Sequence, residues 1–142
     1  MINAIRNYFI NNNIIDENCR LNVDFLSEKP TEFALETIPV DPILEKYLDG
    51  SSLRQYQFQF LSCNNYSADV MQNISNSTFY DNLYSLIEKN NKNHILPTIS
   101  GIQNIECLGN GAILMTDTNT AKYSIQMRIT YIKKGDLYNE TN

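Results

Sequence analysis

The stretch SSLRQYQFQF, residues 51–60, alternates amide and aromatic side chains over its second half. The amide positions are Gln55, Gln57 and Gln59, and the aromatic positions are Tyr56, Phe58 and Phe60. Because successive side chains of a β-strand point to opposite faces, this pattern predicts a strand with one aromatic and one amide face. We expect the aromatic face to be buried, which requires a second layer of structure on that side.

A second strand of the same design is predicted at residues 121–133, AKYSIQMRITYIK. Its apolar face carries Tyr123, Ile125, Met127, Ile129 and Tyr131, and its polar face carries Ser124, Gln126, Arg128 and Thr130. Antiparallel sheets can leave one face in water. A face rich in Gln can form hydrogen bonds without carrying charge, which suits contact with another protein or a lumen. The simpler interpretation is that water solvates this face.

The N-terminal half is predicted to hold one helix and four strands. The helix covers residues 2–12, because Ile2, Ile5 and Phe9 share one side. Strands are expected at 20–26 and 32–38. Residues 43–48 and 53–63 are predicted to form the arms of a hairpin, since Asp49-Gly50 between them favours a two-residue turn.

A long helix is predicted from about residue 68 to residue 90, with Ser67 as its N-cap and Asp69 in its first turn. Its apolar residues fall into two groups that are out of phase near residues 76–78, so we expect a kink or a restart there, with Ser77 as a second cap. The residues of this helix expected in the core are Ile74, Phe79 and Leu83.

The C-terminal part is predicted to form a three-stranded meander. After a crossing segment at 94–100, strands are expected at 101–108, 112–115 and 121–133, joined by a Gly109-Asn110-Gly111 turn and by the polar turn 116–120. Residues 133–142 are expected to be a mobile tail. The fold class is therefore α+β: one domain, 1–142, with an antiparallel sheet and the N-terminal and long central helices packed on one face.

Composition limits the classes of partner. The chain has 142 residues, a net charge of −5 and only 19% charged residues. This balance provides no general attraction to nucleic acid or to an anionic membrane. No apolar run has the length of a membrane-spanning helix, and residues 1–10 lack the features of a signal peptide. We therefore expect a protein that stays in the cytoplasm where it is made.

No reactive constellation points to an enzyme. His94 is the only histidine and lies in an apolar stretch, and Cys19, Cys63 and Cys107 are far apart with no Cys-x-x-Cys pair. No nucleophile motif or phosphate-binding loop occurs. We expect no catalytic residue, no metal and no cofactor.

Several short motifs, in order, resemble the tail terminator (tail-completion, or minor capsid) proteins of long-tailed phages and related prophage elements of Gram-positive bacteria. They are the hairpin K-Y-x-D-G-S-S at 46–52, the strand R-Q-Y-x-F-x-F at 54–60 and D-V-x-Q-N-I-x-N-S-x-F-Y in the long helix. The segments SGIQNIECLGNG and AKYSIQMRITYIK also look like this family. The resemblance covers about two-thirds of the chain and leaves out the first 38 residues. Thr78 stands where the family often has Gly.

The resemblance implies a structural virion protein. Such proteins form a hexameric ring at the head-proximal end of the tail tube, stop tube polymerisation and join the tail to the head connector; in contractile tails they also cap the sheath. The implied partners are further copies of the chain, the tail tube protein and the head–tail connector. DNA passes through the ring without specific binding, and no membrane is involved.

The two-faced strands then acquire expected roles. The core is predicted to include Tyr56, Phe58, Phe60, Ile125, Met127 and Ile129. Contact with a neighbouring subunit or the lumen is predicted for Arg54, Gln55, Gln57, Gln59, Gln126 and Arg128, with the loops at 39–52 and 109–120. Two alternatives stay open: another neck protein at the head–tail junction, and an unrelated monomeric α+β binding domain.

Overall fold

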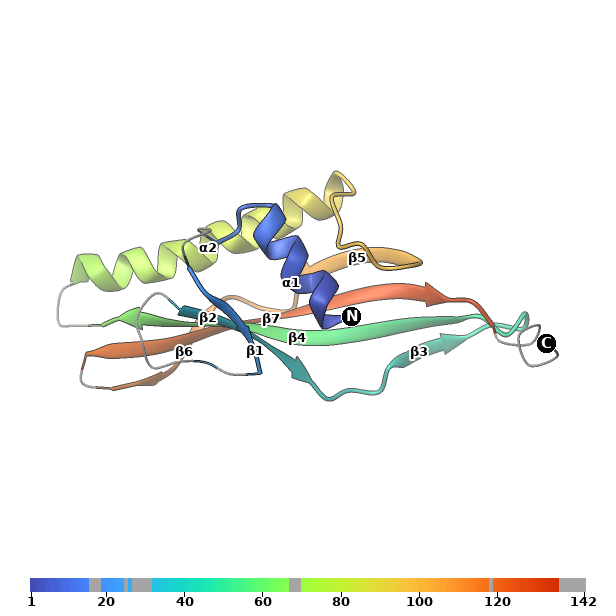
Figure 1. Cartoon of the computed structure of the whole chain (residues 1–142), viewed down its shortest axis with the longest axis horizontal. Helices are drawn as coiled ribbons and strands as arrows, with labels where there is room; N and C mark the ends of the chain where they lie inside the picture. The colour runs from blue at the N-terminus through green and yellow to red at the C-terminus, as the bar shows by residue number, and fades with distance from the viewer. Residues whose placement is uncertain (16–18, 25, 27–31, 67–69, 118, 136–142) are drawn as a thin grey trace.

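A computed structural model describes residues 1–15, 19–24, 26, 32–66, 70–117 and 119–135. The fold is α+β, with two helices on one side of a seven-stranded, mostly antiparallel sheet (Figure 1). The elements are α1 (Ile2–Asn11), β1 (Leu21–Val23), β2 (Glu32–Ile38), β3 (Ile43–Lys46), β4 (Ser52–Asn65), α2 (Val70–Lys92), β5 (Ile102–Cys107), β6 (Ala112–Thr116) and β7 (Thr120–Lys133). In the described part of the chain, neither helix is long and apolar enough to cross a membrane.

Two long strands form the centre of the sheet. β4 and β7 each have 14 residues and pair antiparallel over their whole length, from Ser52 opposite Lys133 to Asn65 opposite Thr120. Each carries two short strands end to end along its outer edge: β3 and β2 on β4, and β5 and β6 on β7. The two strands predicted from side-chain alternation therefore organise the whole sheet.

The sheet departs from the prediction in two pairings. β1 runs parallel to β2, although every strand was expected to be antiparallel. β5 and β6 both pair with β7 and not with each other, so the predicted meander is wrong. The reason is the length of β7, whose edge has room for both strands, while Gly109 to Gly111 carry the chain from one strand to the next instead of folding β6 back on β5.

The helix-side face of the sheet holds the core. Phe58 lies opposite Met127 and Phe60 opposite Ile125, and all four are essentially inaccessible to solvent. Ile129 is equally buried, while Tyr56 is half-buried and packs against the cluster. Aromatic rings connect the layers, since the centroid of Phe60 lies 5.2 Å from that of Phe9 in α1 and 6.2 Å from that of Phe79 in α2. The predicted core positions on β4 and β7 are confirmed.

The long helix is one continuous element with a single buried stripe. The stripe repeats every three or four residues and consists of Asn76, Tyr80, Leu83, Ile87 and Asn90. Leu83 is buried as predicted, and Phe79 packs at the side of the stripe. No restart occurs at residues 76–78. The predicted cap residues Ser67 and Asp69 lie outside the described residues.

The core prediction for Ile74 is wrong, because its side chain is 51% exposed. Ile74 precedes Asn76 by two residues, about 200° around a helix, and so it points away from the sheet. Among the side chains that the structure describes, the buried stripe begins with Asn76, whose amide nitrogen donates to the Asn65 carbonyl oxygen at 2.8 Å. Counting apolar residues alone could not find a stripe that starts and ends with Asn.

The β3–β4 hairpin has a three-residue turn in place of the predicted two-residue one. The Gly50 N–H donates to the Tyr47 carbonyl at 3.1 Å, and the Tyr47 N–H donates to the Ser51 carbonyl at 2.9 Å. Gly50 has φ 88°, the left-handed residue that follows a type I turn in such loops. Leu48 at the tip is fully exposed.

The strands predicted at 43–48 and 112–115 are confirmed as β3 and β6. They lie within the regions 39–52 and 109–120 that are predicted to contact a neighbouring subunit or the lumen. The predicted tail begins too early, because Lys133 is the last residue of β7. Gly135 packs against the hairpin turn, where an added Cβ would lie 2.6 Å from the carbonyl carbon of Gly50. Residues 136–142 lie outside the described residues.

Candidate functional site

The middle of the face of β4 and β7 that turns away from the helices is polar, and we call this part the amide face. Its cross-strand pairs are Gln55 with Thr130, Gln57 with Arg128 and Gln59 with Gln126. Gln126 is exposed, Thr130 is buried and the others are half-buried. The structure thus brings five of the six predicted contact residues together on one surface.

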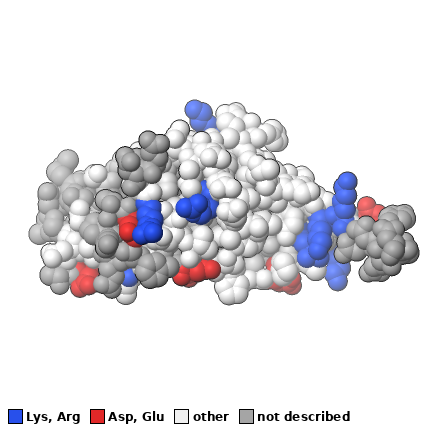
Figure 2. Space-filling model, in the orientation of Figure 1, with Lys and Arg blue, Asp and Glu red and all other residues white. Residues whose placement is uncertain are grey.

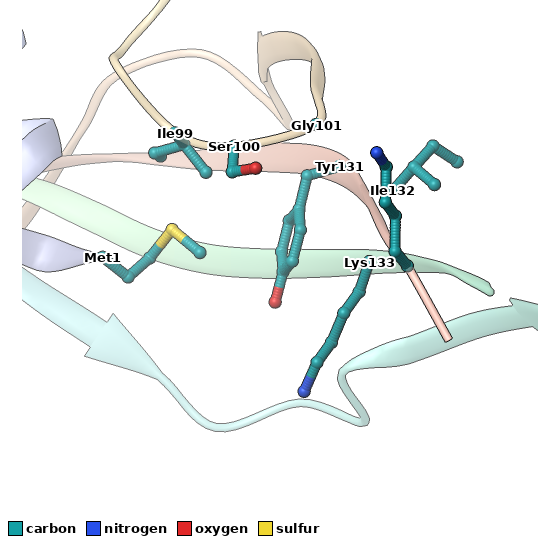
Figure 3. A pocket seen from close by; sticks show the side chains of 8 residues that line it. Met1, Ile99, Ser100, Gly101, Tyr131, Ile132 and Lys133 are labelled. Atoms are coloured by element: carbon teal, nitrogen blue, oxygen red, sulfur yellow. The ribbon is translucent and has the colours of Figure 1, made fainter. Parts of the chain in front are cut away.

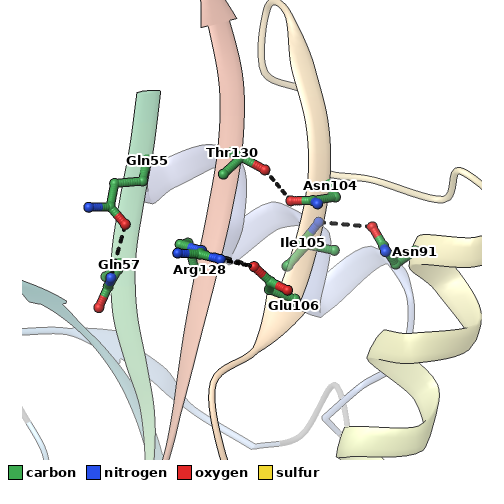
Figure 4. Close-up of polar contacts among 8 residues, drawn as sticks. All are labelled: Gln55, Gln57, Asn91, Asn104, Ile105, Glu106, Arg128 and Thr130. Atoms are coloured by element: carbon green, nitrogen blue, oxygen red, sulfur yellow. Dashed lines mark hydrogen bonds and ion pairs between the residues drawn. The ribbon is translucent and has the colours of Figure 1, made fainter. Parts of the chain in front are cut away.

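The glutamines of β4 bond within the sheet and keep capacity to bond outward. Gln57 donates from Nε2 to Oε1 of Gln55 at 3.0 Å (Figure 4), and Gln55 donates to the Asp41 carbonyl oxygen at 2.8 Å. Gln59 donates to a carboxylate oxygen of Glu36 at 3.2 Å. Since an amide has two N–H donors and an oxygen with two lone pairs, each side chain can still bond to a partner.

The one cation of the amide face is neutralised by its neighbour on β5. Arg128 donates from Nε and Nη2 to the same Glu106 carboxylate oxygen, at 2.9 and 2.5 Å (Figure 4). Thr130 donates to the side-chain oxygen of Asn104, also on β5. The centre of the amide face therefore offers many hydrogen-bonding groups and little net charge.

The predicted place of Arg54 is wrong. In the regular β4–β7 register Arg54 lies opposite Tyr131, and it donates from Nε to the Ser52 hydroxyl oxygen at 3.0 Å, two residues along the same face. It therefore belongs to the helix-side face. Because successive side chains of a strand alternate between faces, Arg54 must lie on the helix-side face when Gln55 lies on the amide face.

Arg54 belongs instead to a group of cations that we call the basic end: Lys46, Arg54, Lys133 and Lys134. Lys46 and Lys133 lie on either side of Ser52 in neighbouring strands, on the helix-side face. Figure 2 shows these basic side chains gathered at the right-hand end of the molecule. Sequence reasoning missed this group, because only Lys133 and Lys134 are adjacent in the chain.

A cleft of about 580 Å³ adjoins the basic end. Met1, Ile99 and Ile132 provide apolar walls, and Lys133 and Lys134 lie at its margin. Tyr131 and Lys133 point the same way from β7 (Figure 3). The cleft is open because the helices do not extend over this end of the sheet (Figure 1).

His94 and Cys107, two side chains with reactive groups, lie after the end of α2 and at the end of β5. His94 is exposed and has φ 56° at the C-terminus of α2. Burial, with the carboxylates of Glu88 and Glu106 nearby, raises the pKa of the Cys107 thiol to about 12, so the thiol keeps its proton and is a weak nucleophile. Within the described ranges, no group of three His, Cys, Asp or Glu side chains could hold a metal ion.

Strand β6 lies within the predicted contact region 109–120, and its exposed apolar side chains were not predicted. All five of its residues are exposed, including Ile113, Leu114 and Met115 at 46%, 57% and 57%. It lies at an edge of the sheet yet has the apolar composition of an interior strand. Such an edge is open to pairing with another chain.

No protein-family model matches the chain, and no curated protein matches it.

Proposed function

We propose that this protein is a structural virion component, a tail terminator that forms a hexameric ring at the head-proximal end of a phage tail tube. In this role it ends tube polymerisation and provides the surface that joins the head connector. The proposal starts from the ordered motifs in the hairpin, in β4 and in α2 that resemble that family. The observation that best supports it is the amide face.

The amide face has the chemistry that a ring subunit needs. A rigid sheet presents it, so its polar groups are held in place without the entropy cost of ordering a loop. Among the six residues that pair across it, the one cation, Arg128, is paired with Glu106. A surface of this kind can bond to a neighbouring subunit or line a lumen through which DNA passes, because neutral amides do not attract phosphates.

The exposed apolar positions support contact with other chains. Leu48 at the hairpin tip and the strand β6 lie at different ends of the long strands. Stable protein contacts bury about 1,200–2,000 Å² in all. A contact of that size on this chain has to extend beyond the amide face, and these two places offer apolar area for it.

The test is reconstitution of tails. Tail tubes assembled without a terminator are mixed with the purified protein, and the products are examined by electron microscopy. We expect a six-fold ring at one end of each tube, a uniform tube length and recovery of head joining. Protein distributed along the tube would contradict the proposal, and binding to isolated head connectors but not to tubes would indicate another neck protein.

A further inference from the structure

We propose that the basic end binds the acidic edge of a second copy of this chain. The acidic edge consists of Asp24, which follows β1, and Glu32 and Glu36 on β2. The inference rests on the proposed ring, because an assembly of copies is what presents one of these surfaces to the other. The inference adds to the proposed ring which two surfaces of neighbouring copies meet, and that opposite charges attract them.

The basic end gathers four positive charges that have no acidic partner in the described part of the chain. Lys46 and Lys133 are separated by one strand, so their backbones are about 10 Å apart. Like charges at such positions repel, which destabilises the isolated subunit. None of the four cations makes an ion pair with a carboxylate among the residues that the structure describes.

Among the residues that the structure describes, the carboxylates next to this group do not neutralise it. Asp49 accepts from the Ser51 N–H at 2.9 Å and from the Ser51 hydroxyl at 2.5 Å, so it is engaged within the turn. Glu45 lies opposite Leu53 in the register, which places it on the other face of the sheet. The positive charge is therefore directed outward on the helix-side face.

Charge elsewhere in the chain complements the basic end. Four of the 11 Lys and Arg residues are in the basic end, so the rest of the sequence has seven against 16 Asp and Glu. Red side chains follow the lower margin of the molecule in Figure 2. A second copy is thus itself a partner with a large excess of negative charge.

The acidic edge is placed to be that partner's contact. β2 pairs with residues 57–63 of β4, whereas the basic end lies at residues 52–54, so the two surfaces occupy different ends of the sheet. Glu32 and Glu36 share one face of β2, and Glu36 is exposed. Asp24 joins β2 through its N–H, which donates to the Leu35 carbonyl at 2.9 Å.

A contact between two different surfaces has a defined consequence for assembly. It is heterologous, and repeating it generates a ring when the rotation between copies closes. A protein copy fits the basic end better than DNA does, because the adjoining cleft has the apolar walls Met1, Ile99 and Ile132. Phosphates gain nothing from such walls.

The experiment is a charge exchange measured by sedimentation velocity of the full chain. At low ionic strength we expect wild-type protein to self-associate with rising concentration, and to do so much less in about 1 M salt, where the Debye length is about 3 Å. Lys133→Glu and Glu36→Lys should each weaken association roughly tenfold, since each replaces an attraction by a repulsion. The double variant should recover most of the loss.

Lys92→Glu is the matched control, because it makes the same change of charge at an exposed position at the end of α2. It should associate like wild type, and all variants should keep the wild-type unfolding midpoint. The inference is overturned if wild-type protein stays monomeric, if it binds a duplex oligonucleotide instead, if Lys92→Glu weakens association equally, or if the double variant shows no recovery. Should Lys133→Glu still cap tail tubes, the contact is wrong while the proposed function stands; failure of wild-type protein to cap tubes would refute that function.

Discussion

The C-terminus of α2 shows how a single residue can carry local strain. The Ile95 N–H donates to the Asn90 carbonyl at 2.8 Å, and the His94 N–H donates to the Asn91 carbonyl at 3.2 Å. This pair of bonds is the Schellman motif, in which the residue at the position of His94 is left-handed and usually Gly. The single histidine of the chain thus has a conformational role at the end of a helix.

Replacing His94 with Gly should therefore stabilise the protein. Relief of the left-handed strain outweighs the extra chain entropy of Gly, and we expect a gain of about 0.5–1 kcal/mol. The unfolding midpoint in a thermal melt should rise by about 2–5 °C. His94→Gln should leave both the midpoint and tube capping unchanged, and a loss of capping in that folded variant would indicate a role for the imidazole.

Two adjacent residues of β4 separate folding from function. Phe58→Asp places a carboxylate in the core, which removes about 1.5–3 kcal/mol of burial and adds the cost of an unpaired charge. A domain with about 5–15 kcal/mol of stability should then be insoluble or molten. Circular dichroism and thermal melts of Phe58→Asp and of the Gln57→Glu variant described next provide the measurement.

Gln57→Glu is the matched change on the opposite face. Its new carboxylate lies opposite Arg128, so the free energy of unfolding should stay within about 0.5 kcal/mol of wild type. We expect the defect in tails of uncontrolled length or tails that fail to join heads. Unfolding of Gln57→Glu together with tolerance of Phe58→Asp would refute the assignment of the two faces.

The Cys107 thiol predicts a loss of stability in alkali. Its pKa is raised to about 12 in the folded state, against about 8.5 in an unfolded chain. The folded state keeps the proton that the unfolded state releases, so stability falls as pH rises above about 8.5, by at most about 1.4 kcal/mol per pH unit from this group. Guanidinium unfolding at pH 8, 9 and 10 measures the slope, which Cys107→Ser should reduce; equal slopes in both proteins would count against it.

At the scale of elements, the two helices are joined by a buried polar contact. The Tyr8 hydroxyl of α1 donates to the Ile95 carbonyl at 2.8 Å and accepts from Nδ2 of Asn90 in α2 at 3.0 Å. Tyr8 and Asn90 are 4% and 5% exposed. The contact sets the position of α1 relative to the end of α2 on the same face of the sheet.

Tyr8→Phe should cost about 2 kcal/mol, because the Asn90 amide and the Ile95 carbonyl lose a buried partner. Chemical denaturation measures the loss. In the double variant Tyr8→Phe, Asn90→Leu the cost should be smaller than the sum of the single costs, since both partners of the bond are then apolar. Additive costs would show that Tyr8 acts through packing alone.

At the scale of the whole molecule, exposed apolar residues on a chain with a complete core point to assembly. Leu48 is fully exposed at the hairpin tip and makes no contribution to the core. Leu44 and Tyr47 of the same hairpin are 43% and 40% exposed, and a group of exposed apolar side chains can mark a contact with another protein. We therefore expect Leu48 to contact another chain in the assembled particle.

Leu48→Asp tests this expectation. The free energy of unfolding should change by less than about 0.5 kcal/mol, since the residue buries nothing in the subunit. The fraction of tubes that carry a ring in electron micrographs should fall severalfold. Leu48→Met, which keeps an apolar side chain, should cap tubes like wild type, and normal capping by Leu48→Asp would remove Leu48 from the contact.

The face of a strand on which each side chain lies can be predicted from the sequence alone, because successive side chains alternate between the two faces. This alternation placed Phe58, Phe60 and Met127 in the core and Gln55 and Gln57 on the other face, and the structure confirms these positions. The same rule applied to residue 54 would have moved Arg54 to the helix-side face. Arg54 had been grouped with the glutamines because it is polar, although its position along the strand puts it on the face of Tyr56 and Phe58.

Helical burial was harder to predict than strand burial. Ile74 was expected in the core because it is apolar, yet among the described side chains of α2 the buried stripe runs from Asn76 to Asn90. These asparagines are buried because their partners come from elsewhere: the Asn65 carbonyl at the end of β4 and the Tyr8 hydroxyl in α1. The residue pattern of α2 alone does not show which groups of β4 and α1 will bond to these asparagines.

The sequence by itself determined the α+β class, the nine elements in order, the two-faced design of β4 and β7 and the motifs behind the proposed function, because each depends on periodicity or turn chemistry within a few residues. Tertiary structure alone decided that β5 and β6 share the edge of β7, that β1 is parallel, and that Lys46, Arg54 and Lys133 gather at one end. These features depend on the register between strands that lie far apart in the chain. Register follows from the packing of whole faces, which no local stretch specifies.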